Sequence, residues 1–261
     1  MAGFIDIACN FTHDSFKHNL DDVINNAEQE GVEKFVLLCA SLSDLDPIKV
    51  IQNHAPEKYF ISAGIHPHHA KEILQINYKE LLSKLKSVNP HAIGETGLDY
   101  FRNISPPDIQ KKSFSMHIEI AKELSLPLYL HRRNAHSDFI NIIKENKNAF
   151  PKFVVHCFTG TQEELDEYLE LGAYIGLTGW ICDAKRNIDL RKSIKNIPIE
   201  KMMIETDSPY LIPKNLMVKP NKNINEPKYL PHIANEICEL TGYDLEELKS
   251  ATSNNAIEFF S

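Results

Sequence analysis

Cysteine is scarce in this chain, and its spacing excludes several classes of small scaffold. The count is odd, no CxxC occurs, and the five cysteines lie far apart: Cys9, Cys39, Cys157, Cys182 and Cys238. A disulfide framework or a zinc knuckle needs paired, clustered cysteines. We therefore expect reduced thiols in a cytoplasmic protein, most of them acting as small buried hydrophobic residues.

Long apolar runs and an excess of basic residues are also missing. No stretch approaches the roughly 18 apolar residues of a membrane span, and the N-terminal stretch with Asp6 and Asn10 does not resemble a signal peptide. Lys and Arg total 28 against 36 Asp and Glu, giving a formal net charge of −8. This charge disfavours binding of nucleic acid through a broad basic face, but it allows a nuclease that contacts phosphate through bound metal.

A rhythm of short β-prone runs and longer amphipathic stretches is present along the whole chain. Helical spacing of apolar residues predicts helices over 19–31, 106–125 and 161–172, the last with Thr161 and Glu164 as a capping box. The predicted strands are Phe4–Cys9, Lys34–Cys39, Tyr59–Gly64, Ala92–Leu98, Pro127–His131, Phe153–Cys157, Tyr174–Leu177 and Met202–Glu205. About eight such units in 261 residues predict a single α/β domain over 1–261, a (β/α)8 TIM barrel. A doubly wound open sheet is the rival, disfavoured because no GxGxxG follows the first strand.

Polar and metal-binding side chains stand just after six of the eight predicted strands. They are Asn10 and Thr12; His66, His68 and His69; Glu95 and Asp99; His131 and His136; His156; and Glu205 and Asp207. In either fold, ligands bind at the carboxyl ends of the strands, so we expect these side chains to share one rim. Imidazoles from His131 and His156 with carboxylates from Glu95 and Asp207 form a mixed set that suits Zn, Mn, Fe or Mg.

Several of these segments resemble the TatD family of metal-dependent deoxyribonucleases, within the wider amidohydrolase-like barrels. They are AGIHPH, AIGETGLDY, HRRNAH, VVHCFTGT, YIGLTGW and IETDSPYL, followed by NEP at 225–227. The resemblance implies a metallo-dependent hydrolase barrel that hydrolyses phosphodiester bonds in DNA, and in RNA as a further substrate. It further implies 3′→5′ exonuclease action on single-stranded ends and, by analogy, a role in DNA repair or degradation. We also expect a monomer.

The resemblance also implies roles for individual residues. Glu95 matches the glutamate that bridges two metals, and His131 and His156 match the ligands of the second metal. Asp207 matches a ligand of the first metal or a partner of the attacking water, and His66 matches a histidine that faces the reaction centre. The expected catalytic residues are thus Glu95, Asp207 and His66. The expected ion is Mg²⁺ or Mn²⁺, with Zn²⁺ as an option at His131 and His156.

The first strand departs from the family pattern. Many members carry His-x-His there, whereas this chain has Asn10 and Thr12, which alternation would place on one face. We expect that pair to lie beside the first metal. His68, Arg102, His136 and Trp180 are the expected substrate contacts. A helix-start hydrogen bond is the alternative for His136, and loop packing is the alternative for Trp180.

Two other functions remain open from the sequence. A small-molecule hydrolase of the amidohydrolase or lactonase type is the first, although such barrels usually keep the histidine pair on the first strand. A binding protein with a degenerate site is the second, although the retained Glu95, His131, His156 and Asp207 argue against it.

Overall fold

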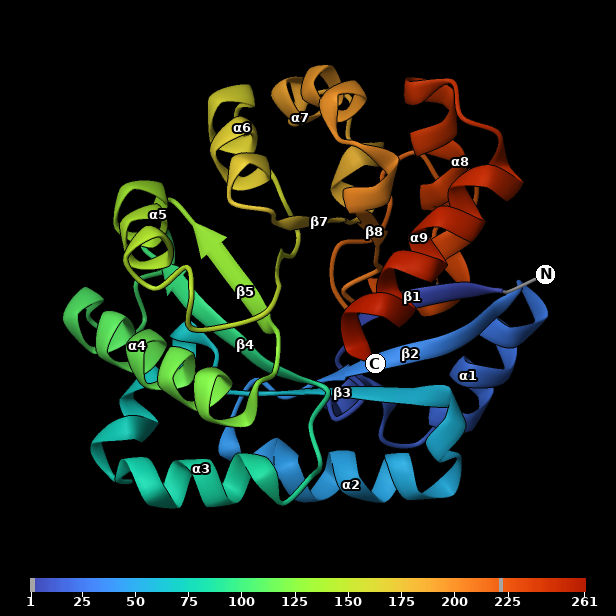
Figure 1. Ribbon diagram of the computed structural model, residues 1–261. Helices are drawn as coiled ribbons and strands as arrows, with labels where there is room; N and C mark the ends of the chain where they lie inside the picture. Colours follow the sequence, from blue (N-terminus) through green and yellow to red (C-terminus); the bar gives the residue numbers. More distant parts are fainter. Residues whose placement is uncertain (1–2, 221–222) are drawn as a thin grey trace.

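The eight predicted strands form one parallel sheet that curves into a barrel (Figure 1). The computed structural model describes residues 3–220 and 223–261. The strands are β1 (Phe4–Cys9), β2 (Val32–Leu38), β3 (Tyr59–Ala63), β4 (Ala92–Asp99), β5 (Leu128–Arg133), β6 (Phe153–Val155), β7 (Tyr174–Leu177) and β8 (Met202–Ile204). Each strand pairs in parallel with the next, in sequence order. The predicted (β/α)8 barrel is therefore confirmed, with strand ends that differ from the predicted ones by at most two residues.

The seam between the last strand and the first is closed by few contacts. A single parallel bridge joins Cys9 to Ser208, and the Asn10 N–H donates to the Ser208 carbonyl at 2.9 Å. Deeper in the seam, Asp6 accepts hydrogen bonds from the Thr206 backbone N–H at 2.9 Å and from its hydroxyl at 2.5 Å. Side chains thus replace much of the backbone ladder at this seam.

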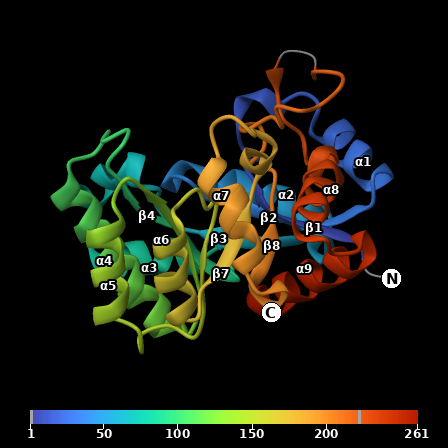
Figure 2. The same cartoon turned by 90° about the horizontal axis from the view of Figure 1, so that it is seen from above.

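Helices surround the barrel, as the views along and across it show (Figures 1 and 2). The α-helices are α1 (Leu20–Gln29), α2 (Leu45–His54), α3 (Tyr78–Lys86), α4 (Pro107–Leu124), α5 (His136–Glu145), α6 (Gln162–Glu170), α7 (Ile188–Ser193), α8 (Leu230–Thr241) and α9 (Leu245–Phe260). Short 3-10 helices are η1 (Asp14–Phe16), η2 (Leu42–Asp44), η3 (Pro56–Lys58), η4 (Pro67–Leu74), η5 (Gly179–Cys182), η6 (Ile194–Asn196), η7 (Ile199–Lys201) and η9 (Pro227–Tyr229). Within 3–220 and 223–261, none of the helices has the length and hydropathy to cross a membrane.

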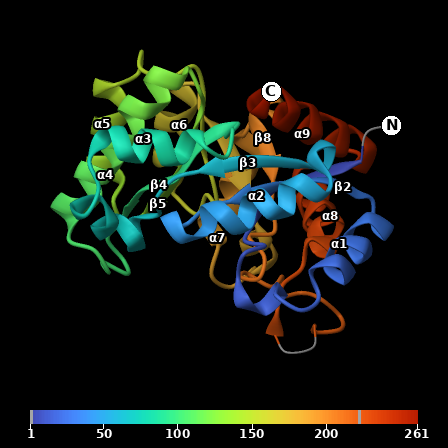
Figure 3. The same cartoon turned by 90° about the horizontal axis from the view of Figure 1, so that it is seen from below.

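The three helices predicted from the sequence are present, each one to two residues shorter at its ends. The capping box at the start of α6 forms as predicted: Thr161 accepts from the Glu164 N–H at 3.4 Å, and Glu164 accepts from the Thr161 N–H at 3.1 Å. Seen from below, α2 runs beside β3 on the outside of the barrel (Figure 3).

Two apolar layers follow from the alternation of side chains along the strands. Outward residues such as Phe35, Leu37 and Leu130 pack under the helices. Inward residues such as Ile7 and Tyr129 form a second cluster together with Phe259 and Phe260 at the end of α9. This inner cluster fills one end of the barrel and leaves the other end to polar side chains.

A buried histidine of α4 fastens the segment that carries His66. His117 Nε2 accepts a hydrogen bond from the Ile65 backbone N–H at 3.0 Å, and its Nδ1 lies 2.7 Å from the Ser113 carbonyl, to which it donates. The neutral ring satisfies both partners, and a second proton would remove the acceptor for Ile65. Burial lowers the pKa of His117 to about 4.

This histidine should make the stability of the fold depend on pH. An unfolded imidazole has a pKa near about 6.5, so between that value and about 4 only the unfolded chain takes up the proton. Folding stability should therefore fall as the pH is lowered, by about 2 kcal/mol from this group between pH 7 and pH 5. We expect His117→Gln, which cannot titrate, to lose less stability over that range than wild type. Urea denaturation of metal-free protein at both pH values measures this loss.

The matched control is His54→Gln, because His54 lies exposed at the end of α2. It should keep the wild-type pH dependence. An equal loss of stability in wild type and His117→Gln would show that His117 does not contribute.

Candidate active site

A cleft of about 880 Å³ opens at the carboxyl ends of the strands. Most of the predicted site residues line it: Asn10, His66, His68, Glu95, Arg102, His131, His156, Trp180 and Asp207. They come from strand ends or from the loops that follow them, as the barrel topology requires. The structure therefore brings together side chains that are separated by up to 197 residues in the chain.

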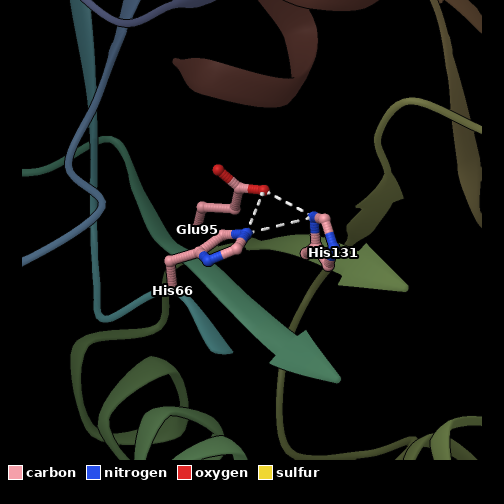
Figure 4. Close-up of side chains that lie close together, drawn as sticks. All are labelled: His66, Glu95 and His131. Carbon is pink, nitrogen blue, oxygen red and sulfur yellow. Dashed lines mark hydrogen bonds and ion pairs between the residues drawn. The ribbon is translucent and has the colours of Figure 1, made fainter. Parts of the chain in front are cut away.

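The buried carboxylate of Glu95 is the centre of this cleft. Its Oε1 lies 2.7 Å from His156 Nε2, 2.8 Å from His131 Nδ1 and 3.4 Å from His66 Nε2. Figure 4 shows His66 and His131 converging on this oxygen. Burial opposes ionisation, but the neighbouring imidazoles of His156 and His66 hold the pKa of Glu95 well below its usual value. Glu95 is therefore a permanent negative charge among three imidazoles.

Two glycines allow the backbone of β4 to carry Glu95 to this point. Gly94 and Gly97 have φ angles of +149° and +138°, and a Cβ on either would lie about 2 Å from a carbonyl oxygen of β5. Only glycine fits this close approach and this backbone conformation. The GETG sequence thus places the carboxylate next to the histidines of β5 and β6.

On each of the three rings, the near nitrogen faces Glu95 and the far nitrogen points away from it. The rings differ in what contacts the far nitrogen. The far nitrogens of His131 and His156 face carboxylates: His131 Nε2 is 3.5 Å from Asp99 Oδ2, and His156 Nδ1 is 3.4 Å from Glu205 Oε1. By contrast, the far nitrogen of His66 accepts the His68 backbone N–H at 3.1 Å.

Burial opposes protonation of the rings, but neighbouring carboxylates raise the pKa of His131 and of His156, so in the metal-free protein their near nitrogens donate to Glu95. A bound cation would displace those near protons and leave a proton on each far nitrogen, toward Asp99 or Glu205. In His66 the far nitrogen accepts an N–H and carries no proton, so the neutral ring carries its proton on Nε2, toward the cleft.

Asp99 and Glu205 lie at the ends of predicted strands, but the sequence predicts no specific role for either. Asp99 also accepts from His68 Nε2 at 2.8 Å. Glu205 is fully buried and accepts from the Tyr129 hydroxyl at 2.9 Å and from the Cys157 backbone N–H at 2.5 Å. Alternation offered one usable signal, because Asp99 lies four residues beyond Glu95 on the same strand and so on the same face.

The first-strand pair separates in the structure. Asn10 lies in the cleft, and its Nδ2 donates to Asp207 Oδ1 at 3.0 Å and to the Ser208 carbonyl at 3.1 Å. Thr12 instead donates to Asp44 Oδ1 at 3.1 Å. The prediction that the two share a face was wrong, because β1 ends at Cys9 and the chain turns before Thr12.

Asp207 completes the acidic side of the cleft. It has a φ of +55°, which turns its side chain back toward Asn10. Loss of hydration, only partly offset by His156, raises the pKa of Asp207 to about 7. A cation beside this carboxylate would lower that pKa again.

These residues fit a divalent metal ion. Nitrogen and oxygen atoms of His66, Glu95 and His131 lie within 4.8 Å of one another, and His156 Nε2 is 3.4 Å from His131 Nδ1. The far atoms His131 Nε2 and His156 Nδ1 are buried and make no full hydrogen bond with the described residues. The donor set of imidazole and carboxylate is that of Zn²⁺, Mn²⁺ or Fe²⁺ sites. His66, Glu95, His131 and His156 are thus the residues that could hold an ion, with Asp207 beside them.

The four expected substrate contacts fall into two groups. His68, Arg102 and Trp180 lie in the cleft wall. His136 does not line the cleft, because its ring is held between the α5 and α6 helices. Its Nδ1 lies 2.8 Å from the Tyr168 hydroxyl and its Nε2 lies 3.2 Å from Glu167 Oε1. These contacts join α5 to α6 and differ from the helix-start hydrogen bond that is the alternative expected from the sequence.

Comparison with known proteins identifies the family of this chain. The model of the family described as TatD related DNase matches residues 5–261. The chain is 38% identical over 255 residues to the 3′-5′ ssDNA/RNA exonuclease TatD of Pectobacterium carotovorum subsp. carotovorum, covering 98% of both chains. It is 39% identical to the protein of the same name from Citrobacter rodentium, covering 98% of this chain and 97% of that one.

A solved structure agrees with the sequence matches. The crystal structure of a TatD family hydrolase from Entamoeba histolytica superposes with a TM-score of 0.89 at 30% identity, covering 99% of this chain and 98% of that one. The resemblance seen in the sequence motifs and the nuclease class that it implied are thereby confirmed, and the chain belongs to the TatD-related DNase family.

Proposed function

We propose that this protein is a metal-dependent 3′→5′ exonuclease that trims single-stranded ends of DNA, and of RNA as a second substrate. One observation carries the proposal: Glu95 faces two imidazoles that are backed by carboxylates and one that is backed by an N–H. With a cation bound, that arrangement would supply two imidazole ligands and one proton donor around a single negative charge. The names of the relatives support the polarity and the substrate.

In this proposal Glu95, His131 and His156 hold the ion, and Asp207 offers a second, oxygen-lined position. A bound divalent ion would lower the pKa of a water molecule and neutralise charge on the phosphate. Mg²⁺ or Mn²⁺ suits the oxygen donors near Asp207, whereas Zn²⁺ also suits the two imidazoles. The chain's own residues supply the remaining chemistry.

Asp207 and His66 are the proposed proton-handling groups. Asp207 Oδ1 is occupied by the Asn10 amide, so its Oδ2 is the atom that can accept a proton from water. His66 Nε2 carries a proton toward the cleft and can donate it in a hydrogen bond to a phosphate oxygen. His68, Arg102 and Trp180 then line the path of the strand.

The shape and charge of the cleft favour a strand end over a duplex. The site lies at the bottom of a single cleft in a chain of formal net charge −8, and no broad basic face is expected to hold a double helix. A duplex end must also unpair before its phosphate reaches Glu95, at a cost of a few kcal/mol. We further propose that the chain acts as one domain, as a monomer, in the cytoplasm.

Digestion of labelled oligonucleotides tests the proposed function. A 5′-labelled single strand, incubated with Mg²⁺ or Mn²⁺, should give a ladder that shortens one nucleotide at a time from the 3′ end. The blunt duplex of the same sequence should be trimmed more slowly, and EDTA should stop both reactions. Cleavage of a circular single strand would refute an exonuclease, because a circle offers no end.

His66 should affect catalysis without affecting metal binding. We expect His66→Gln to lower kcat by about 100-fold, the usual scale of a lost proton donor, while the affinity for Mn²⁺ stays within twofold of wild type. His131→Gln should lose both catalytic activity and Mn²⁺ affinity. Parallel calorimetric titration and oligonucleotide assays separate the two variants. Equal losses of Mn²⁺ affinity in both would make His66 a metal ligand instead.

Glu95 should contribute most to metal affinity. Glu95→Gln keeps the shape of the side chain but removes its charge, so we expect the Mn²⁺ dissociation constant to rise at least tenfold, about 1.4 kcal/mol. Titration of EDTA-treated protein measures this constant, and circular dichroism checks that the fold is kept. Glu163→Gln, on the surface of α6, is the matched control and should bind Mn²⁺ as wild type does. Unchanged affinity in Glu95→Gln would place the ion elsewhere.

A further inference from the structure

Two of the five arginines of the chain have no carboxylate partner among the described residues. Arg132, Arg186 and Arg191 each lie within 4.0 Å of a carboxylate: those of Glu164, Asp183 and Glu236. Arg102 and Arg133 form no such ion pair with any residue in 3–220 or 223–261. Both line the cleft. In a chain with an excess of acidic residues, unpaired guanidinium groups at the mouth of a cleft indicate an anionic ligand.

An exposed aromatic ring connects these two arginines. The Arg133 guanidinium lies over the Phe101 ring, 4.0 Å from its centroid, and Arg102 follows Phe101 in the chain. Phe101 is 57% exposed although it lines the cleft, and Ile104 beside it is 54% exposed. With Arg133 on one face, the rest of the ring is open to a ligand that can stack. Nucleobases stack on aromatic rings, and this stacking tolerates any base.

The loop that carries Phe101 is held in place by buried hydrogen bonds. Gln110, which is fully buried in α4, accepts from the Asp99 N–H at 2.8 Å and donates to the carbonyls of Asp99 at 3.1 Å and Ser105 at 2.7 Å. The Arg102 N–H donates to Asp99 Oδ1 at 2.8 Å. Phe101 and the backbone of Arg102 are thus held in an ordered loop, and Arg133 ends β5, which lowers the cost of ordering these residues on binding.

Asp99 also fixes the distance from this loop to the catalytic centre. Its Oδ1 receives the Arg102 N–H, while its Oδ2 lies 2.8 Å from His68 Nε2 and 3.5 Å from His131 Nε2. The Asp99 carboxylate therefore contacts both the loop and His131, a proposed metal ligand. Phe101 and Glu95 line the same cleft, so a strand whose end reaches Glu95 can also reach the Phe101 ring.

We propose that Phe101, Arg102 and Arg133 form a subsite for the nucleotide next to the one that is removed. Its base stacks on the open face of Phe101, and the two guanidinium groups bind the phosphates that flank it. This inference rests on the proposed nuclease function. Single-stranded nucleic acid fits better than an acidic peptide, because the subsite pairs a flat ring with two cations and adjoins a centre built for phosphate.

The test compares Phe101→Ala with wild type on single-stranded oligonucleotides of one sequence. We expect KM to rise about tenfold, the scale of one lost base stack, with kcat within twofold of wild type. With an abasic second nucleotide from the 3′ end, wild type and Phe101→Ala should have the same KM, because no base remains to stack. With an abasic residue ten nucleotides from the 3′ end, the full difference in KM between wild type and Phe101→Ala should persist. Phe101→Tyr, which keeps the flat ring, should restore wild-type KM.

The arginines are tested by the salt dependence of binding. Arg102→Gln and Arg133→Gln should each reduce the slope of log affinity against log salt concentration by about 0.7, the value for one phosphate contact on a single strand. Lys147→Gln, a matched charge change at an exposed position beyond α5, is the control and should leave the slope unchanged.

For the Phe101→Ala comparison, Leu74→Ala is the control for loss of an exposed apolar side chain, since Leu74 is 59% exposed in η4.

The outcomes separate the subsite from the function on which it rests. Wild type that fails to trim any oligonucleotide refutes the proposed function itself. Normal trimming by wild type, with an unchanged KM in Phe101→Ala, refutes the subsite alone and leaves the ring for another partner. A KM penalty that persists with the abasic second nucleotide also refutes it, because the ring would then act on structure and not on a base.

Discussion

The negative charge of Glu95, held out of water, is the constraint on which the rest of the site depends. A buried carboxylate is tolerated only where opposite charge or hydrogen-bond donors replace its lost hydration. Here the replacement comes from the end of β5, the residue after β6 and the loop after β3. The ends of β3, β5 and β6 must therefore lie at the same level along the barrel axis as the Glu95 carboxylate. The register of these strands in the sheet thus determines whether the charge of Glu95 is compensated.

The groups behind the imidazoles decide what each ring can do. In the proposed mechanism, Asp99 and Glu205 orient His131 and His156 as metal ligands, and a single backbone N–H makes His66 a donor. Histidines that face the same carboxylate can thus have different chemical roles, depending on what contacts the second ring nitrogen. Asp99 has a further part, because the same carboxylate holds the loop of Phe101 and Arg102. Asp99 thus contacts both a proposed metal ligand, His131, and the loop in the cleft wall.

The sequence predicted the barrel well because its strands alternate regularly and its helices have clear ends, as the capping box of Thr161 shows. It also predicted which residues meet in the cleft, since the carboxyl ends of parallel strands share one rim. It failed where the chain leaves regular structure. Thr12 was misplaced because a turn follows Cys9. The partners of His136, the nitrogen that each imidazole presents and the ring contact of Arg133 all depend on side-chain directions that periodicity does not encode.

The seam between β8 and β1 has a consequence for how the protein is made. Asp207 and its partner Asn10 lie on opposite sides of that seam and belong to opposite ends of the chain. During synthesis, a ribosome-bound chain can already contain Glu95, His131 and His156 while the last strand has not yet emerged. Such an intermediate has neither Asp207 nor a closed barrel. Assembly of the cleft is therefore postponed until translation has passed β8, and a partly made chain lacks the complete set of groups that line it.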